Sequence, residues 1–169
     1  MKPPERRTGL AAVAGPGTRL LLLGSFPGVA SLQAQQYYGH PRNQFWPLLG
    51  ALWGVPNLIA RPYAERLQLM VAHGLGLWDV YGACEREGSL DSAIRRPEFN
   101  DMAGLAAGLP ALAGIAHNGA ESARARRYTA SLGVPVFQLP SSSPTHAAWS
   151  FERKLAAWRE VFAACDLLE

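Results

Sequence analysis

The sequence predicts a three-layer α/β/α sandwich built around a central, mainly parallel four-stranded sheet. Short apolar runs alternate along the chain with segments in which apolar residues recur at helical spacing. The first apolar run, residues 20–23, consists of four leucines in a row, which is typical of a strand covered on both faces. Parallel neighbours also require crossover segments, and the predicted helices between the apolar runs supply them.

The amino-terminal segment, residues 1–18, differs from the rest of the chain. It is rich in proline, glycine and arginine and has no periodicity, so we expect a flexible tail. We expect the remaining residues, 19–169, to form a single domain, since 49% hydrophobic and 17% charged residues in a chain of 169 is ordinary globular composition.

The elements of this domain are predicted from apolar spacing and from residues that begin or end helices. Pro62 suits the start of the second helix and Gly74 its end, and Ser150 is a suitable N-cap for the last helix. The charged and irregular residues 82–100 predict a long excursion without regular structure. In chain order, strands are expected at residues 20–23, 76–81, 114–117 and 134–139, and helices at residues 44–53, 63–73, 101–108, 120–132 and 151–168.

Three polar loops follow predicted strands. They read GSFPG through HPRNQFW at residues 24–46, HNG at residues 117–119 and LPSSSPTHA at residues 139–147. In open parallel sheets the carboxyl ends of the strands meet at one edge, where ligands usually bind. We therefore expect the three loops to converge on one site.

Taken together, the three loops resemble those of the uracil-DNA glycosylase superfamily. The resemblance is greatest to its hypoxanthine (deoxyinosine) DNA glycosylase branch, a sister of the mismatch-specific uracil glycosylases, and it extends from about residue 20 to the end of the chain. It implies a monofunctional DNA glycosylase of base excision repair that hydrolyses the N-glycosidic bond of deaminated bases: hypoxanthine first, with uracil and xanthine as further candidates. The residues that carry the resemblance are Gly24, Pro27, Gly28, Ser31, Leu32, Tyr37, Tyr38, His40, Pro41, Asn43, Phe45 and Trp46, then Asn118 and Gly119, then residues 141–147.

One departure from the family pattern bears on the catalytic residue. In the mismatch-specific enzymes the turn after the first strand has a sequence that resembles GINPG, and its asparagine helps to place the attacking water. This chain has Phe26 at the position of that asparagine, and phenylalanine cannot hold water by hydrogen bonding. The resemblance implies that the asparagine of the HPxN element, Asn43 here, takes this role. No Asp or Glu lies inside the three loops, and Glu121 opens a helix, so we expect no carboxylate base.

Cleavage of a base–sugar bond passes through a state in which the sugar is positive and the base negative, so neutral groups that orient water and bind the base can suffice. The amide of Asn118 can accept a hydrogen bond from a ring N–H and donate one to the adjacent carbonyl. It can thus bind N3–H and O4 of uracil and equally N1–H and O6 of hypoxanthine. By resemblance, Tyr38 stacks against the flipped base. The expected base-binding residues are Gly24, Ser25, Phe26, Tyr38 and Asn118, and the expected contacts of the DNA backbone and loops are Pro27, Gly28, His40, Arg42, Ser141, Ser142, Ser143, Thr145 and His146.

Several of these residues also have a purely structural interpretation. Asn118 before Gly119 could form a simple turn after a strand. His40 is better explained as a hydrogen-bonding residue that fixes its loop than as a proton donor. The aromatic residues before the first helix favour core packing over base contact. These are Tyr37, Phe45 and Trp46.

Composition limits the remaining possibilities. The net charge is only +3, but the 16 basic residues include only two lysines, and arginine suits bidentate phosphate contacts; a coding bias toward arginine explains the same count. Cys84 and Cys165 are too few for an iron–sulfur cluster and too isolated for a zinc ribbon, so we expect no metal and no cofactor. No apolar run approaches 18 residues, so we expect no membrane association and a cytoplasmic location. We further expect the protein to be nucleoid-associated and monomeric.

The expected partner is double-stranded or single-stranded DNA that contains a deaminated base. Two other functions remain open at this point. One is a mismatch-specific glycosylase for uracil or thymine opposite guanine. The other is a non-catalytic domain that binds damaged DNA or a nucleotide.

Overall fold

The computed structural model describes residues 5–168. Four strands form a parallel sheet in the order β3-β2-β6-β7, and all three pairings are parallel. This confirms the predicted α/β class and the predicted sheet. The strands are β2 (Leu20–Gly24), β3 (Leu75–Asp79), β6 (Gly114–Asn118) and β7 (Val136–Leu139).

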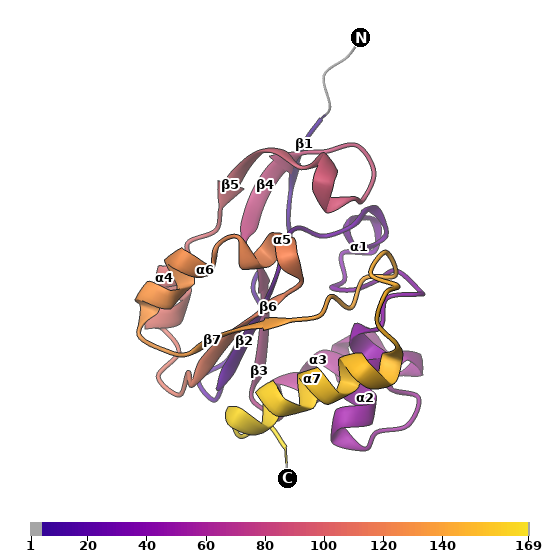
Figure 1. Ribbon diagram of the computed structural model, residues 1–169, viewed down its shortest axis with the longest axis vertical. Coiled ribbons are helices and arrows are strands. Elements are labelled where there is room, and N and C mark those ends of the chain that lie inside the picture. The colour runs from indigo at the N-terminus through magenta and orange to yellow at the C-terminus, as the bar shows by residue number, and fades with distance from the viewer. Residues whose placement is uncertain (1–4, 169) are drawn as a thin grey trace.

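Helices cover both faces of this sheet (Figure 1). Because side chains alternate along a strand, Leu20 and Leu22 of β2 belong to one apolar core and Leu21 and Leu23 to another. The first core also contains residues of α2 (Phe45–Trp53), α3 (Tyr63–Ala72) and α7 (Phe151–Ala164). The second core contains Met102 of α4 (Met102–Ala107) and Ala125, which links α5 (Ala120–Ala123) to α6 (Arg126–Thr129).

A second, antiparallel sheet was not predicted. It consists of β1 (Arg6–Thr8), β4 (Tyr81–Glu85) and β5 (Arg95–Phe99) in the order β1-β4-β5. The expectation that residues 82–100 lack regular structure is therefore wrong. Every residue of β5 is exposed, so its sequence has no apolar alternation that could have revealed a strand.

The expectation of a flexible tail also needs correction for its described part. Residues 6–8 pair with β4, Val13 forms a bridge with Leu77, and Tyr37 Oη donates to the Ala11 carbonyl at 2.7 Å. Backbone hydrogen bonds hold this segment, and such bonds leave little signal in a sequence rich in arginine and glycine. Residues 1–4 of the expected tail lie outside the described residues.

Most predicted helices are confirmed, and Ser150 caps α7 by accepting from the Arg153 N–H at 3.2 Å. The predicted helix over residues 120–132 is instead three short pieces, α5, α6 and the 3₁₀ turn η3 (Ala130–Leu132). A short helix, α1 (Val29–Ala34), and the turns η1 (Leu58–Ala60) and η2 (Asp91–Ala93) were not predicted. None of the helices within residues 5–168 has the length and apolar character that a membrane span needs.

Candidate active site

The predicted loops converge at the carboxyl edge of the parallel sheet, around a cavity of about 550 Å³ that we call the central cavity. Its floor is formed where three adjacent strands end, at Gly24 of β2, Asp79 of β3 and Asn118 of β6. All predicted site residues except His146 line it. These are Gly24, Ser25, Phe26, Pro27, Gly28, Tyr38, His40, Arg42, Asn43, Asn118, Ser141, Ser142, Ser143 and Thr145.

Asn43, the predicted catalytic residue, lies just before α2 and is half-buried. Its side-chain carbonyl accepts from the Phe45 N–H at 2.9 Å, and its own N–H donates to the His40 carbonyl at 3.0 Å. The first bond orients the amide and leaves the second lone pair of Oδ1 able to accept another hydrogen bond. The amide can therefore hold a water molecule without giving up the contact that positions it.

Tyr38 has a left-handed backbone conformation, with φ 54°, which is strained for a residue other than glycine. Two contacts hold it there. Its ring stacks on Phe45, with centroids 4.1 Å apart and planes at 26°, and its hydroxyl accepts from Asn118 Nδ2 at 3.2 Å. Burial and the nearby Asp79 raise the pKa of Tyr38, so the hydroxyl stays protonated. One ring face is already occupied, and a base could stack only on the other.

Asn118 is fixed by neighbours to a degree that the sequence did not suggest. Its Oδ1 accepts from the Ser142 N–H at 3.0 Å, and its Nδ2 donates to Ser142 Oγ at 2.9 Å and to Tyr38 Oη. Both amide hydrogens are thus used, and one lone pair on Oδ1 remains for a ligand. Asn118 joins β6 to the loop after β7, and its predicted role in reading a base rests on that single lone pair.

The same contacts correct the assignment of Ser142 to the DNA backbone. Ser142 is fully buried, its N–H and hydroxyl bond to Asn118, and its carbonyl accepts from the Gln44 N–H at 2.9 Å. It holds the loop in place, and its full burial keeps its hydroxyl out of reach of a phosphate. Ser143 and Thr145 remain accessible, and their hydroxyl oxygens lie 2.8 Å apart.

His146 lies apart from Asn118, contrary to the sequence expectation. It lines a second cavity of about 360 Å³, which we call the side hollow, together with Trp149 and Lys154. Nδ1 of His146 is buried without a hydrogen-bond partner among the described residues. Arg42, together with Ser143 and Pro144, lines both cavities and so connects them.

His40 has the structural role suggested as its alternative. Its ring is exposed, and Nδ1 accepts from the Arg42 N–H at 3.1 Å. The predictions for the neighbouring aromatic residues are likewise confirmed, because Tyr37, Phe45 and Trp46 are all buried in the core. His117 is completely buried between Ser122 Oγ and Thr129 Oγ1, both 2.8 Å from its ring nitrogens.

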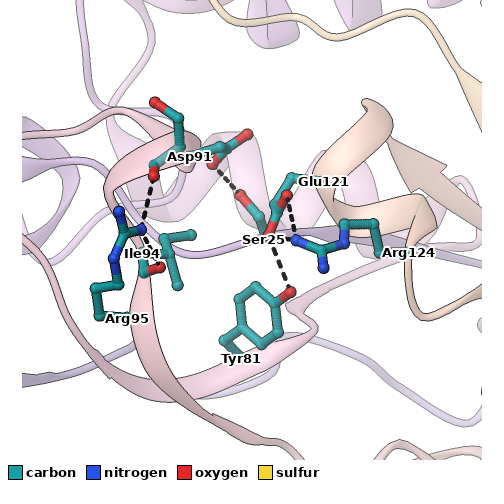
Figure 2. Close-up of polar contacts among 8 residues, drawn as sticks. Ser25, Tyr81, Asp91, Ile94, Arg95, Glu121 and Arg124 are labelled. Carbon is teal, nitrogen blue, oxygen red and sulfur yellow. Dashed lines mark hydrogen bonds and ion pairs between the residues drawn. The ribbon is translucent and has the colours of Figure 1, made fainter.

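The sequence predicted no carboxylate base within the three loops, and two carboxylates from outside those loops, Asp79 and Asp91, line the central cavity. Asp79 is the last residue of β3, and Asp91 begins η2 within the segment that was expected to be irregular. Figure 2 shows how this segment is attached to the first loop: Ser25 Oγ donates to Asp91 Oδ1 at 2.5 Å. Within the segment, Arg95 donates to the Ile94 carbonyl. The predicted strand at residues 76–81 ran past Asp79, where β3 ends, so the prediction placed this carboxylate inside a strand and not at the ligand edge.

Glu121, the acidic residue that the sequence placed nearest to the loops, does not line the central cavity. Its carboxylate accepts from Tyr81 Oη at 3.1 Å and pairs with Arg124 at 3.3 Å (Figure 2). It therefore helps to attach α5 to the antiparallel sheet.

Asp79 is 5% exposed, and its Oδ2 has no hydrogen-bond partner among the described residues. Burial raises its pKa to about 7, the negative charge of Asp91 adds to this rise, and the guanidinium of Arg86 opposes it. Burial likewise raises the pKa of Asp91, while the hydrogen bond from Ser25 lowers it. The cavity thus contains two carboxyl groups whose charged forms are disfavoured.

Arg86 links the antiparallel sheet to the first loop. It is 1% exposed, donates to the carbonyls of Pro27 and Gly88, and lies 5.2 Å from the ring centroid of Phe26. Phe26, which replaces the asparagine of the GINPG-like turn, packs into the second core. It supports the wall of the cavity and offers no hydrogen bond to water.

Comparisons with known proteins show which family the chain belongs to. No model of a protein family matches the chain. It is 38% identical over 156 residues to the hypoxanthine DNA glycosylase of Methanosarcina acetivorans, an alignment that covers 92% of this chain and 98% of the relative. It is 35% identical over 157 residues to the hypoxanthine DNA glycosylase of Methanosarcina barkeri, covering 93% and 98%.

A solved structure has the same fold. The solution NMR structure of a protein from Methanosarcina acetivorans, for which uracil DNA glycosylase activity has been proposed, superimposes with a TM-score of 0.82 at 37% sequence identity. The match covers 93% of this chain and 99% of the other. The chain therefore belongs to the hypoxanthine DNA glycosylase family of the uracil-DNA glycosylase superfamily.

Proposed function

We propose that the protein is a monofunctional DNA glycosylase that hydrolyses the N-glycosidic bond of hypoxanthine in DNA, as the first step of base excision repair. The observation that carries this proposal is the central cavity. It lies at the edge of a parallel sheet and brings together Asn43, Tyr38 and Asn118 in a chain whose relatives over nearly full length are hypoxanthine DNA glycosylases.

A base inside a duplex is out of reach of such a cavity, so the proposal requires the damaged nucleotide to flip out of the stack. The volume of about 550 Å³ is in the range of pockets that bury small organic ligands, and it is sufficient for a purine and part of its sugar. The unoccupied face of Tyr38 would stack on the flipped base. The free lone pair of Asn118 Oδ1 would accept its N1–H, a hydrogen that adenine lacks.

Asn43 would orient the attacking water. With Oδ1 held by the Phe45 N–H, its second lone pair accepts a water hydrogen and directs the water oxygen toward C1′. The C1′–N9 bond breaks with its electron pair passing to the base, and the water oxygen forms the new bond to C1′. A fixed amide dipole can favour such a charge-separated transition state without being ionised.

The DNA backbone would run across the mouth of the central cavity and over the side hollow. Arg42 lines both cavities, and the side hollow adds His146 and the nearly buried Lys154, whose ammonium group donates to Gln44 Oε1 at 2.9 Å. Close by, the Arg153 guanidinium lies 3.6 Å from the ring centroid of Trp149. The guanidinium groups of Arg42 and Arg153, with the accessible hydroxyls of Ser143 and Thr145, suit contacts to phosphates.

A panel of labelled duplexes tests the proposal. Each carries one hypoxanthine, uracil or xanthine, and base loss is scored as strand breakage after alkali treatment. We expect breakage at hypoxanthine, with thymine opposite, at a rate far above that of the undamaged duplex. Breakage confined to uracil would favour a mismatch-specific glycosylase instead, and binding without breakage at any lesion would favour a non-catalytic binder.

A further inference from the structure

We propose that Asp79 is a second catalytic residue, which contacts the flipped base at the floor of the central cavity and donates a proton to it as the glycosidic bond breaks. This inference rests on the proposed function and deepens it.

The carboxyl group of Asp79 lies at the floor of the central cavity. Asp79 ends β3 beside Gly24, its partner in register on β2, and a side chain at residue 24 would collide with Asp79 Oδ1. The same absent side chain would lie 3.2 Å from Tyr38 Oη. Glycine at this position therefore leaves the carboxyl next to the Tyr38 hydroxyl, at the floor of the cavity.

The carboxyl group of Asp79 is buried and incompletely hydrogen-bonded among residues 5–168. Although Asp79 is 5% exposed, its Oδ2 makes no hydrogen bond within the described part of the chain. A side chain does bond to its backbone, since Asn100 Nδ2 donates to the Asp79 carbonyl at 2.8 Å. A buried carboxyl without a partner is unfavourable in either protonation state, and a bound ligand removes this penalty.

Asp79 and Asn43 lie at different depths in the central cavity. Asn43 is half-buried in the loop before α2, whereas Asp79 lies at the strand ends with Asn118 as a neighbour in the cavity lining. A flat base that enters the cavity reaches the floor first, while the sugar and the attacking water stay near the rim. Asp79 is therefore placed to act on the base, and Asn43 on the water.

The charges around the carboxyl suit a proton donor. Asp91 of η2 faces it from one side, Arg86 from the segment after β4, and Tyr37 and Tyr38 from the loop before α2. His40 and Arg42 lie farther out in the cavity lining. Burial and Asp91 raise the pKa of Asp79 to about 7, so both protonation states are populated near neutral pH. Such a group can give up a proton and regain it in each turnover.

The C1′–N9 bond breaks, its electron pair moves into the ring of hypoxanthine, and the Asp79 hydroxyl transfers its proton to the base, which leaves as a neutral molecule. The water held by Asn43 bonds to C1′ and releases a proton to solvent. The Asp79 carboxylate takes up a proton from solvent and returns to its acid form.

The test is a single-turnover measurement of hypoxanthine excision between pH 5.5 and 9 for wild type and Asp79→Asn. The wild-type rate should fall about tenfold per pH unit above the pKa of Asp79, because only the protonated form donates. Asp79→Asn keeps the shape but carries no acidic proton, so it should be about 10²–10⁴-fold slower and lose this fall with pH. Asp166→Asn makes the same chemical change at an exposed residue after α7 and should match the wild type.

Binding separates a catalytic role from a structural one. Duplexes with a 2′-fluoro-deoxyinosine that resists cleavage should bind Asp79→Asn within a few-fold of the wild-type Kd. An Asp79→Asn variant that excises hypoxanthine at the wild-type rate would overturn the inference, and so would a wild-type rate that rises with pH through neutrality. The wild-type profile decides the matter alone if the variant does not fold. If the wild type excises no base at all, the proposed function fails, which is a different result.

Discussion

Gly24 and Asp79 are partners in register at the carboxyl ends of β2 and β3, and the Asp79 carboxyl occupies the space that a side chain on residue 24 would need. A glycine in the first loop and a carboxyl at the end of the second strand are thus one feature of the cavity floor. A side chain at residue 24 and the observed position of the Asp79 carboxyl therefore exclude each other.

This relationship predicts the outcome of Gly24→Ala. The new Cβ must displace the Asp79 carboxyl or the Tyr38 hydroxyl, and overpacking of this kind costs about 1–3 kcal/mol of unfolding free energy. We expect a lower thermal midpoint and a loss of excision that exceeds the loss of stability. Gly17→Ala is the matched control, because a Cβ there meets nothing within 4 Å. Equal effects of the two changes would contradict the proposed packing.

The contact between Asn118 and Ser142 predicts a loss of stability in Asn118→Ala. The buried Ser142 N–H and hydroxyl would lose their partner, which costs about 1–3 kcal/mol. Urea unfolding of the variant should show this loss, while Ser131→Ala, at an exposed hydroxyl, should stay within about 0.5 kcal/mol of the wild type. An unchanged midpoint for Asn118→Ala would mean that the loop after β7 does not depend on this residue.

Arg42 should contribute to DNA binding through charge alone. Removing one phosphate contact lowers the slope of log Kd against log salt by about 1, whatever the base sequence. We expect this change for Arg42→Ala with both damaged and undamaged duplexes, measured by fluorescence anisotropy. Arg159→Ala, on an exposed position of α7, should leave the slope as it is. A slope unchanged in Arg42→Ala would remove Arg42 from the proposed DNA-binding surface.

His117 predicts a pH dependence of stability. Burial, and to a lesser degree Arg126, lower its pKa to about 4 from an ordinary value of 6.5. The unfolded chain therefore takes up a proton first as the pH falls, and the stability that neutral His117 contributes is lost between pH 6.5 and about 4, with a magnitude up to about 3 kcal/mol.

Asp79 acts in the opposite direction, since its pKa in the folded state is raised. The measured quantity is therefore the difference in unfolding free energy between wild type and His117→Gln, taken at pH 7 and at pH 4.5. That difference should shrink at the lower pH. A difference that is constant with pH would show that His117 titrates normally in the folded protein.

The part of the fold that could be predicted from the sequence is the part that is buried. β2 appears as four leucines because both of its faces contact a core. The antiparallel sheet left no such signal, because β5 is fully exposed and β1 is three residues long. Its strands are held by backbone hydrogen bonds, which any sequence can make.

The site was predictable where it consists of loops that directly follow predicted strands. Asp91 was not, because its contact with Ser25 joins residues 66 positions apart. Asp79 was overlooked as part of a strand, although the last residue of a parallel strand faces the ligand edge. The roles of Ser142 and His146 depend on which way each turn of one loop points, and the loop sequence does not specify that.

The most direct test of the account is the single-turnover rate of hypoxanthine excision from duplex DNA by wild type and Asn43→Ala, measured side by side. We predict excision by the wild type and a rate about 10²–10³-fold lower in the variant, as expected when one positioned dipole is removed from a transition state. Excision by Asn43→Ala at the wild-type rate, or no excision by the wild type, would contradict it.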